Sequence, residues 1–112
     1  MRMKTLLAAL VLATPVWAQE TKLDAAQITV ALTDRTLSYD DGATQVFRAD
    51  GATVYDKGRV SEGRWAVRGD QYCSVWPPSD QWACYDLRAS ADGRALTFVA
   101  GDGSTTTGRT GQ

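Results

Sequence analysis

A series of glycine turns between residues 41 and 103 most constrains what this chain can fold into. The turns separate short segments in which apolar and polar residues alternate, a pattern typical of strands with one buried face. Asp-Gly dipeptides accommodate a positive φ and join antiparallel strands tightly. We therefore expect a mainly β fold, a small antiparallel meander of about seven or eight short strands that forms a barrel or a sandwich. The turns lie at residues 41–42, 50–51, 57–58, 69–70, 92–93 and 102–103.

The strands predicted between these turns follow from the alternating segments. The last segment, residues 104–112, is expected to form either an edge strand or a flexible tail. The predicted strands occupy residues 36–40, 44–48, 52–55, 63–68, 72–76, 82–88 and 95–100.

A short helix is predicted at residues 24–32, ahead of the first of these strands. Asp24 is a good N-cap, Gln27 stands three residues on as in a capping box, and Ile28 and Leu32 share one helical face. A strand is the alternative, because β-branched residues occur at positions 29 and 30. We favour the helix, preceded by a flexible leader at residues 19–22.

Residues 1–18 have the three-part composition of a secretory signal peptide. Arg2 and Lys4 give a positive start, residues 5–14 are almost wholly apolar, and Val16 and Ala18 place small side chains at a signal-peptidase site. A transmembrane anchor is the alternative, but a span needs about 20 apolar residues and this run is shorter. We predict cleavage after Ala18, leaving residues 19–112 as a single periplasmic or secreted domain of bacterial type with no transmembrane segment.

Composition excludes several classes of function. The 12 basic and 13 acidic residues are interspersed, so no clustered basic face is available for nucleic acid. The chain has no histidine, which removes Ser-His-Asp and Cys-His catalysis and imidazole metal sites. Two cysteines alone cannot complete a four-ligand structural zinc site. We expect no catalytic residue, no metal and no cofactor.

The two cysteines, Cys73 and Cys84, are predicted to form a disulfide, as an even count in an exported domain indicates. A four-residue loop at 77–80 would place these cysteines directly opposite each other, within bridging range. The same register sets Tyr72 against Tyr85 and puts Val75 opposite Trp82. One face of the hairpin then carries the cysteines with Val75 and Trp82, and the other carries Tyr72, Trp76, Tyr85 and Leu87.

The aromatic residues of this hairpin are the only candidate binding residues that the sequence offers. Exposed rings can stack on a sugar or contact a partner protein. The alternative, which we favour, is that most of them fill the core of a small domain, with Trp76 and Trp82 the most exposed. The candidates are Tyr72, Trp76, Trp82 and Tyr85.

Several of these segments together resemble a family of small exported bacterial β-domain proteins of unknown function. The resemblance spans residues 31–87 and rests on Thr36-Leu37, on Asp50-Gly51-Ala52-Thr53, on Gly63-Arg64-Trp65 and on Tyr72-Cys73 with Cys84-Tyr85. Asp34 stands where those chains often have glycine. The pattern consists of turns, one tryptophan and a disulfide, so it implies a shared compact β fold and transfers no site residues.

A fainter resemblance is to periplasmic metalloprotease inhibitors, which are small signal-bearing β-barrels with one disulfide. These proteins insert an amino-terminal segment into the protease cleft, and by position residues 19–23 would fill that role here.

Three functions are therefore considered. We expect a non-enzymatic binding module of the cell envelope, acting on an envelope ligand or protein through an aromatic surface or a small barrel mouth. The first alternative is a secreted or periplasmic protease inhibitor. The second is an enzyme that uses carboxylates alone, which is disfavoured because general acid–base chemistry so often employs histidine.

Overall fold

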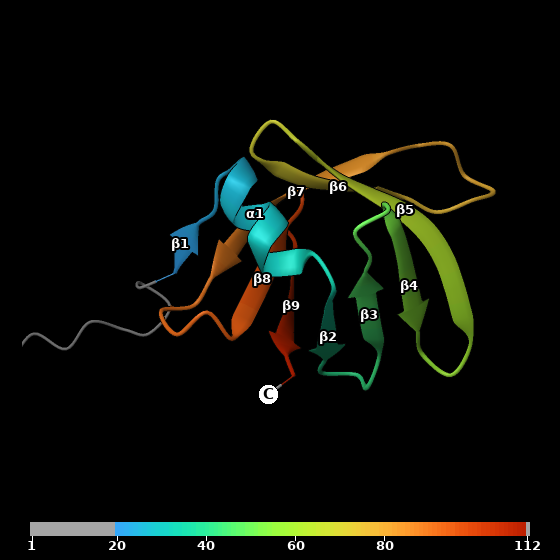
Figure 1. Cartoon of the computed structure of the whole chain (residues 1–112), viewed down its shortest axis with the longest axis horizontal. Helices are drawn as coiled ribbons and strands as arrows, with labels where there is room; N and C mark the ends of the chain where they lie inside the picture. The colour runs from blue at the N-terminus through green and yellow to red at the C-terminus, as the bar shows by residue number, and fades with distance from the viewer. Residues whose placement is uncertain (1–19, 112) are drawn as a thin grey trace, which may run out of the picture.

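The computed structural model describes residues 20–111, so the predicted signal peptide at 1–18 lies outside the described residues. Within them the chain forms one helix and nine strands (Figure 1). The elements are β1 (Thr21–Lys22), α1 (Ala25–Leu32), β2 (Arg35–Tyr39), β3 (Thr44–Phe47), β4 (Ala52–Asp56), β5 (Val60–Arg68), β6 (Gln71–Val75), β7 (Ala83–Ala89), β8 (Ala95–Val99) and β9 (Thr105–Thr110).

The eight strands from β2 to β9 form a closed antiparallel barrel. Each strand pairs with the next along the chain, and β9 returns to pair with β2 through Leu37 opposite Thr110 and Tyr39 opposite Gly108. The predicted mainly β meander is thus confirmed, and it is a barrel. The segment at 104–112, expected as an edge strand or tail, supplies β9, the strand that closes it.

The strand β1 lies outside the barrel and corrects the prediction of a flexible leader at 19–22. Thr21 and Lys22 pair with Ala89 and Arg88 at the end of β7, beyond the part of β7 that pairs with β6. A strand of two residues is too short to show an alternating pattern, so it could not be predicted.

The start of β5 is the strand boundary that differs most from the prediction. It begins at Val60 rather than at residue 63, and Val60, Ser61 and Glu62 are all exposed. Alternation cannot reveal a segment that has no buried face.

The predicted helix is confirmed, and it covers one end of the barrel. The Asp24 carboxylate accepts a hydrogen bond from the Gln27 amide, and the Gln27 side chain accepts one from the Asp24 amide, both at 2.9 Å. This reciprocal pair satisfies two helix donors that would otherwise lack partners. Ile28 and Leu32 are fully buried, while Val30 faces solvent. Burial of that single apolar stripe favours the helix over the strand alternative.

The four Asp-Gly turns share one local structure. In each, the aspartate side chain accepts a hydrogen bond from the amide two residues on, at Ala43, Ala52, Arg94 and Ser104. The following glycine has a positive φ, as at Gly51 with 93°. Asp34 also has a positive φ, 60°, in the short link between α1 and β2. Aspartate is one of the few residues other than glycine that tolerates this conformation.

The core occupies the half of the barrel next to α1. Phe47 lies at its centre, with its ring centroid 5.8 Å from both Trp65 and Tyr72 and 6.4 Å from Phe98. The Trp65 indole donates a hydrogen bond to the carbonyl of Arg48, which satisfies its buried N–H. The remaining buried members are Leu23, Ile28, Leu32, Leu37, Leu87 and Leu96.

The predicted disulfide between Cys73 and Cys84 is confirmed, with the two Cα atoms 4.0 Å apart. Its register is also as predicted, since Tyr72 lies opposite Tyr85. The last pair toward the loop is Ser74 with Ala83, so the predicted pairing of Val75 with Trp82 does not form. Pro77 and Pro78 have no amide hydrogen to donate, which is a reason for the ladder to end early.

Candidate functional site

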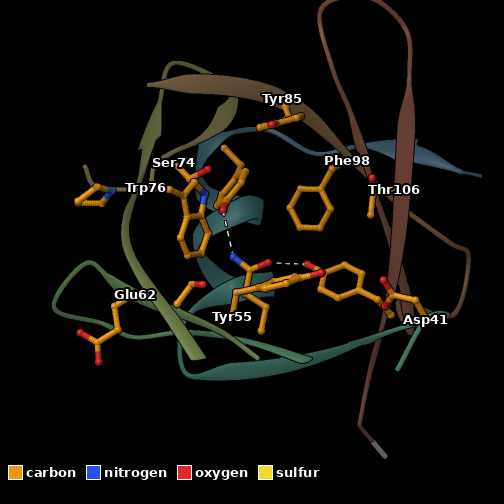
Figure 2. A pocket seen from close by; sticks show the side chains of 13 residues that line it. Asp41, Tyr55, Glu62, Ser74, Trp76, Tyr85, Phe98 and Thr106 are labelled. Atoms are coloured by element: carbon orange, nitrogen blue, oxygen red, sulfur yellow. Dashed lines mark hydrogen bonds between the residues drawn. The ribbon is translucent and has the colours of Figure 1, made fainter. Parts of the chain in front are cut away.

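A cavity of about 630 Å³ opens at the end of the barrel opposite α1 (Figure 2). Its walls come from the strand ends remote from the helix, such as Tyr39 at the end of β2 and Thr106 near the start of β9. We call this space the mouth cavity. It is lined by Tyr39, Asp41, Gln45, Tyr55, Ser61, Glu62, Tyr72, Ser74, Trp76, Pro77, Tyr85, Phe98 and Thr106.

Six of its thirteen lining residues are aromatic. On one side Tyr55 lies between Tyr39, at 6.2 Å, and Trp76, at 6.3 Å between ring centroids. On the other side the rings of Tyr72, Tyr85 and Phe98 lie 5.1–6.4 Å from one another. Tyr72 and Phe98 are also core residues, so they form the floor where the filled half of the barrel meets the open half.

A hydrogen-bonded chain of side chains fixes the polar part of that floor. The Tyr39 hydroxyl donates to Gln45 Oε1 at 2.7 Å, and Gln45 Nε2 donates to Thr53 Oγ1 at 2.9 Å and to the Tyr72 hydroxyl at 3.4 Å. Thr53 in turn donates to the carbonyl of Val46. Both amide hydrogens of the buried Gln45 are used, so its side chain is held in one orientation.

The ionisable groups of the mouth cavity are acids and phenols. Burial raises the pKa of Tyr39 and of Tyr72, which keeps both phenols neutral. Hydrogen bonds from the Ala43 amide and from Lys57 hold the pKa of Asp41 below its usual value. The Glu62 carboxylate points away from the rings (Figure 2). The lining contains no lysine or arginine.

Three of the four aromatic residues singled out from the sequence come together in this cavity. Tyr72, Trp76 and Tyr85 line it, because they occupy the inward-facing positions of β6, β7 and the segment after β6. Trp82 shares the other face of the hairpin with Cys84 and lies outside the barrel, 38% exposed, with the Arg68 guanidinium 4.1 Å from its ring centre. Trp76 is only partly exposed, since its ring packs between Tyr55 and β5.

The other lining residues were not identified from the sequence. Gln45 was the most informative of those missed, because it occupies the same strand face as the core residue Phe47. A polar residue at an inward-facing position of a predicted barrel strand is a signal that the interior is not wholly apolar. Tyr39 follows Leu37 on one face of β2 in the same way.

Gly63 holds the position of Trp76. A Cβ atom at residue 63 would lie 2.6 Å from the Val75 carbonyl and 2.7 Å from Trp76 Cε3. Glycine therefore lets the indole lie directly against the backbone of β5.

We expect Gly63→Ala to lower the free energy of unfolding by about 1–3 kcal/mol, because a backbone oxygen cannot move aside cheaply. The shifted Trp76 ring should also change the tryptophan emission spectrum of the folded protein. Gly101→Ala is the control, since a Cβ there meets nothing within 4 Å. Equal unfolding midpoints and equal spectra for the two variants in a urea titration would contradict this account.

Within residues 20–111, no group of three or more acidic or cysteine side chains is arranged to hold a metal ion. No helix in the same range is long and apolar enough to cross a membrane. Comparison of the chain with protein-family models, with curated proteins and with solved structures finds no match.

Proposed function

We propose that this protein is a non-enzymatic binding module of the cell envelope, and that it holds a small organic ligand in the mouth cavity. The observation that carries the proposal is a cavity of about 630 Å³ with aromatic walls and a fixed polar floor, in an otherwise filled barrel. An eight-stranded barrel is just wide enough either to be filled by side chains or to hold one small ligand.

The size and lining of the cavity support a ligand of drug-like dimensions. Binding pockets for such molecules typically measure about 300–1,000 Å³ and combine apolar walls with a few fixed polar groups. The ring walls supply the apolar surface, and the chain from Tyr39 through Gln45 to Thr53 supplies polar groups already held in place. A prearranged site loses less freedom on binding than one that must be ordered by its ligand.

The lining supports binding rather than catalysis. The hydroxyls of Ser61, Ser74 and Thr106 have no histidine or lysine among the lining residues to activate them. Of the two acids, Asp41 is paired with Lys57 at 3.0 Å, and Glu62 points away from the rings. A carboxylate-only hydrolase would need two carboxylates facing each other across a bound substrate.

The proposed location rests on two features. Residues 1–18 have the composition of an export signal. The disulfide between Cys73 and Cys84 is of the kind that persists in oxidising compartments outside the cytoplasm.

The protease-inhibitor alternative gains no support from the amino-terminal segment. Thr21 and Lys22 are paired with β7, and Leu23 is buried in the core. A segment held against its own barrel in this way is not presented for insertion into a cleft.

Two tryptophan substitutions on β9 test the proposal. Thr106 faces the mouth cavity, whereas its neighbour Thr105 lies on the opposite face of the strand. We expect Thr106→Trp to fill the cavity and to weaken binding of the neutral dye Nile red at least tenfold, while Thr105→Trp leaves it unchanged.

The same variants should differ in what they carry from the envelope. Native mass spectrometry should show extra mass on the wild type and on Thr105→Trp, and none on Thr106→Trp. Failure of the wild type to bind the dye and to carry any extra mass would refute the proposed function.

A further inference from the structure

We infer that the ligand of the mouth cavity is an organic cation, a quaternary or protonated amine attached to an apolar body. This inference rests on the proposed function and names the chemical class that the lining favours.

Aromatic rings surround the mouth cavity instead of forming a single platform. They come from five strands and from the segment after β6, and Figure 2 shows Tyr55, Trp76, Tyr85 and Phe98 distributed around the space. The face of each ring carries negative charge density that attracts a cation within about 6 Å. A cation placed among rings that line one space is therefore attracted by more than one of them.

Adjacent rings of the lining are steeply inclined to one another. Tyr55 and Trp76 meet at 79°, and Tyr85 and Phe98 meet at 86°. The remaining adjacent pairs of the lining are inclined by 37–63°. Walls that meet at corners surround a roughly spherical group such as trimethylammonium. A flat ligand or a sugar would instead require one broad face or two parallel faces.

The lining contains acidic side chains but no basic ones. Asp41 and Glu62 are its only acidic side chains, and neither a lysine nor an arginine lines the cavity to compensate an anion. A buried anion without a partner is costly, so an anionic ligand is disfavoured. An amine would meet aromatic rings, neutral hydroxyls and the Gln45 amide, and no cationic side chain of the lining.

Lys57 does not line the cavity but is paired with Asp41, which does. Its ammonium is 3.0 Å from Asp41 Oδ2, and both side chains are about half exposed. Lys57 therefore offsets part of the attraction that Asp41 would exert on a bound amine. The rings carry most of the preference, and Asp41 tunes it.

The experiment compares two ligands of equal shape. One is the phenyl ether of choline, and the other is its neutral isostere, in which a tert-butyl group replaces trimethylammonium. Phenoxyacetate supplies the matched anion. Dissociation constants measured by tryptophan fluorescence and calorimetry should favour the cation over its isostere by about tenfold, or about 1.4 kcal/mol.

Variants at Trp76 separate ring electrostatics from apolar packing. We expect the ratio of the two dissociation constants to fall toward one in Trp76→Leu and to stay intermediate in Trp76→Phe, which keeps a ring. This ratio is measured on the folded fraction, so a general loss of stability does not change it. Lys57→Met should tighten cation binding several-fold at low salt and leave the neutral isostere unaffected.

The outcomes distinguish this inference from the function on which it rests. A ratio near one, or tighter binding of phenoxyacetate, would overturn the cation and leave a ligand-binding cavity in place. The absence of binding by all three compounds would also overturn it. The proposed function would then be decided separately by the Thr106→Trp and Thr105→Trp comparison.

Discussion

Replacing Phe47 with alanine is expected to lower the free energy of unfolding by about 3–5 kcal/mol, the usual cost of removing a buried aromatic side chain. Phe47 has no exposed surface, and its ring contacts the rings of Trp65, Tyr72 and Phe98. A barrel closed on all sides by hydrogen-bonded strands cannot collapse far around the missing ring. The variant should therefore retain most of the resulting void.

Urea unfolding followed by tryptophan fluorescence measures this loss. Val60→Ala is the matched control, because Val60 is 57% exposed on a strand of the same barrel and should change stability by less than about 0.5 kcal/mol. Phe47→Ala should also weaken ligand binding, since Tyr72 and Phe98 form the floor of the mouth cavity and rest on Phe47. A stability loss below that of an ordinary surface substitution would show that Phe47 is not the centre of the core.

The strands of this barrel could be predicted from sequence because their signals are local. An aspartate that accepts from the amide two residues on, followed by glycine, defines a turn within a few residues. Alternation then assigns the inward face of each strand. The register of β6 on β7 was also accessible, because only one arrangement brings Cys73 opposite Cys84.

Closure of the barrel could not be predicted in the same way. The strand β9 reads TTTGRT, with no apolar residue to mark a buried face. Its pairing with β2 joins residues far apart in the chain, and Gly108 fits there because a Cβ would lie 2.9 Å from Tyr39 Cε1. That steric requirement exists only once both strands are in place, so no local pattern could indicate it.

The mouth cavity was partly predictable for the same reason. Tyr72, Trp76 and Tyr85 belong to one hairpin, and its alternation placed all three on one face. Phe98 lies on β8, which pairs with β7 of the hairpin, but Tyr39 lies on β2, which faces the hairpin only because the barrel closes. Sequence reasoning could identify a set of aromatic side chains on one face, but not that this face enclosed a space.

Removing the disulfide is expected to lower the free energy of unfolding by about 3 kcal/mol while leaving the mouth cavity intact. Cys73 and Cys84 are 11 residues apart, and a loop of that size loses about this much conformational freedom in the unfolded chain when it is closed. The inward side chains of the same hairpin are Tyr72 and Tyr85, so by alternation the cysteines lie on the other side of the barrel wall. The bond therefore acts on folding and does not contact the ligand.

Two ways of breaking the bond test this separation of roles. The double variant Cys73→Ala with Cys84→Ala and the wild type treated with a reductant should lose similar stability in urea. Because reduction keeps both sulfur atoms, which the double variant removes, agreement between them assigns the loss to the cross-link. Below the unfolding transition, both should bind Nile red within about twofold of the oxidised protein, since a twofold change is well under 1 kcal/mol. If reduction abolished dye binding in a protein that remained folded, the disulfide would be part of the binding site, and the redox state of the compartment would control the ligand directly.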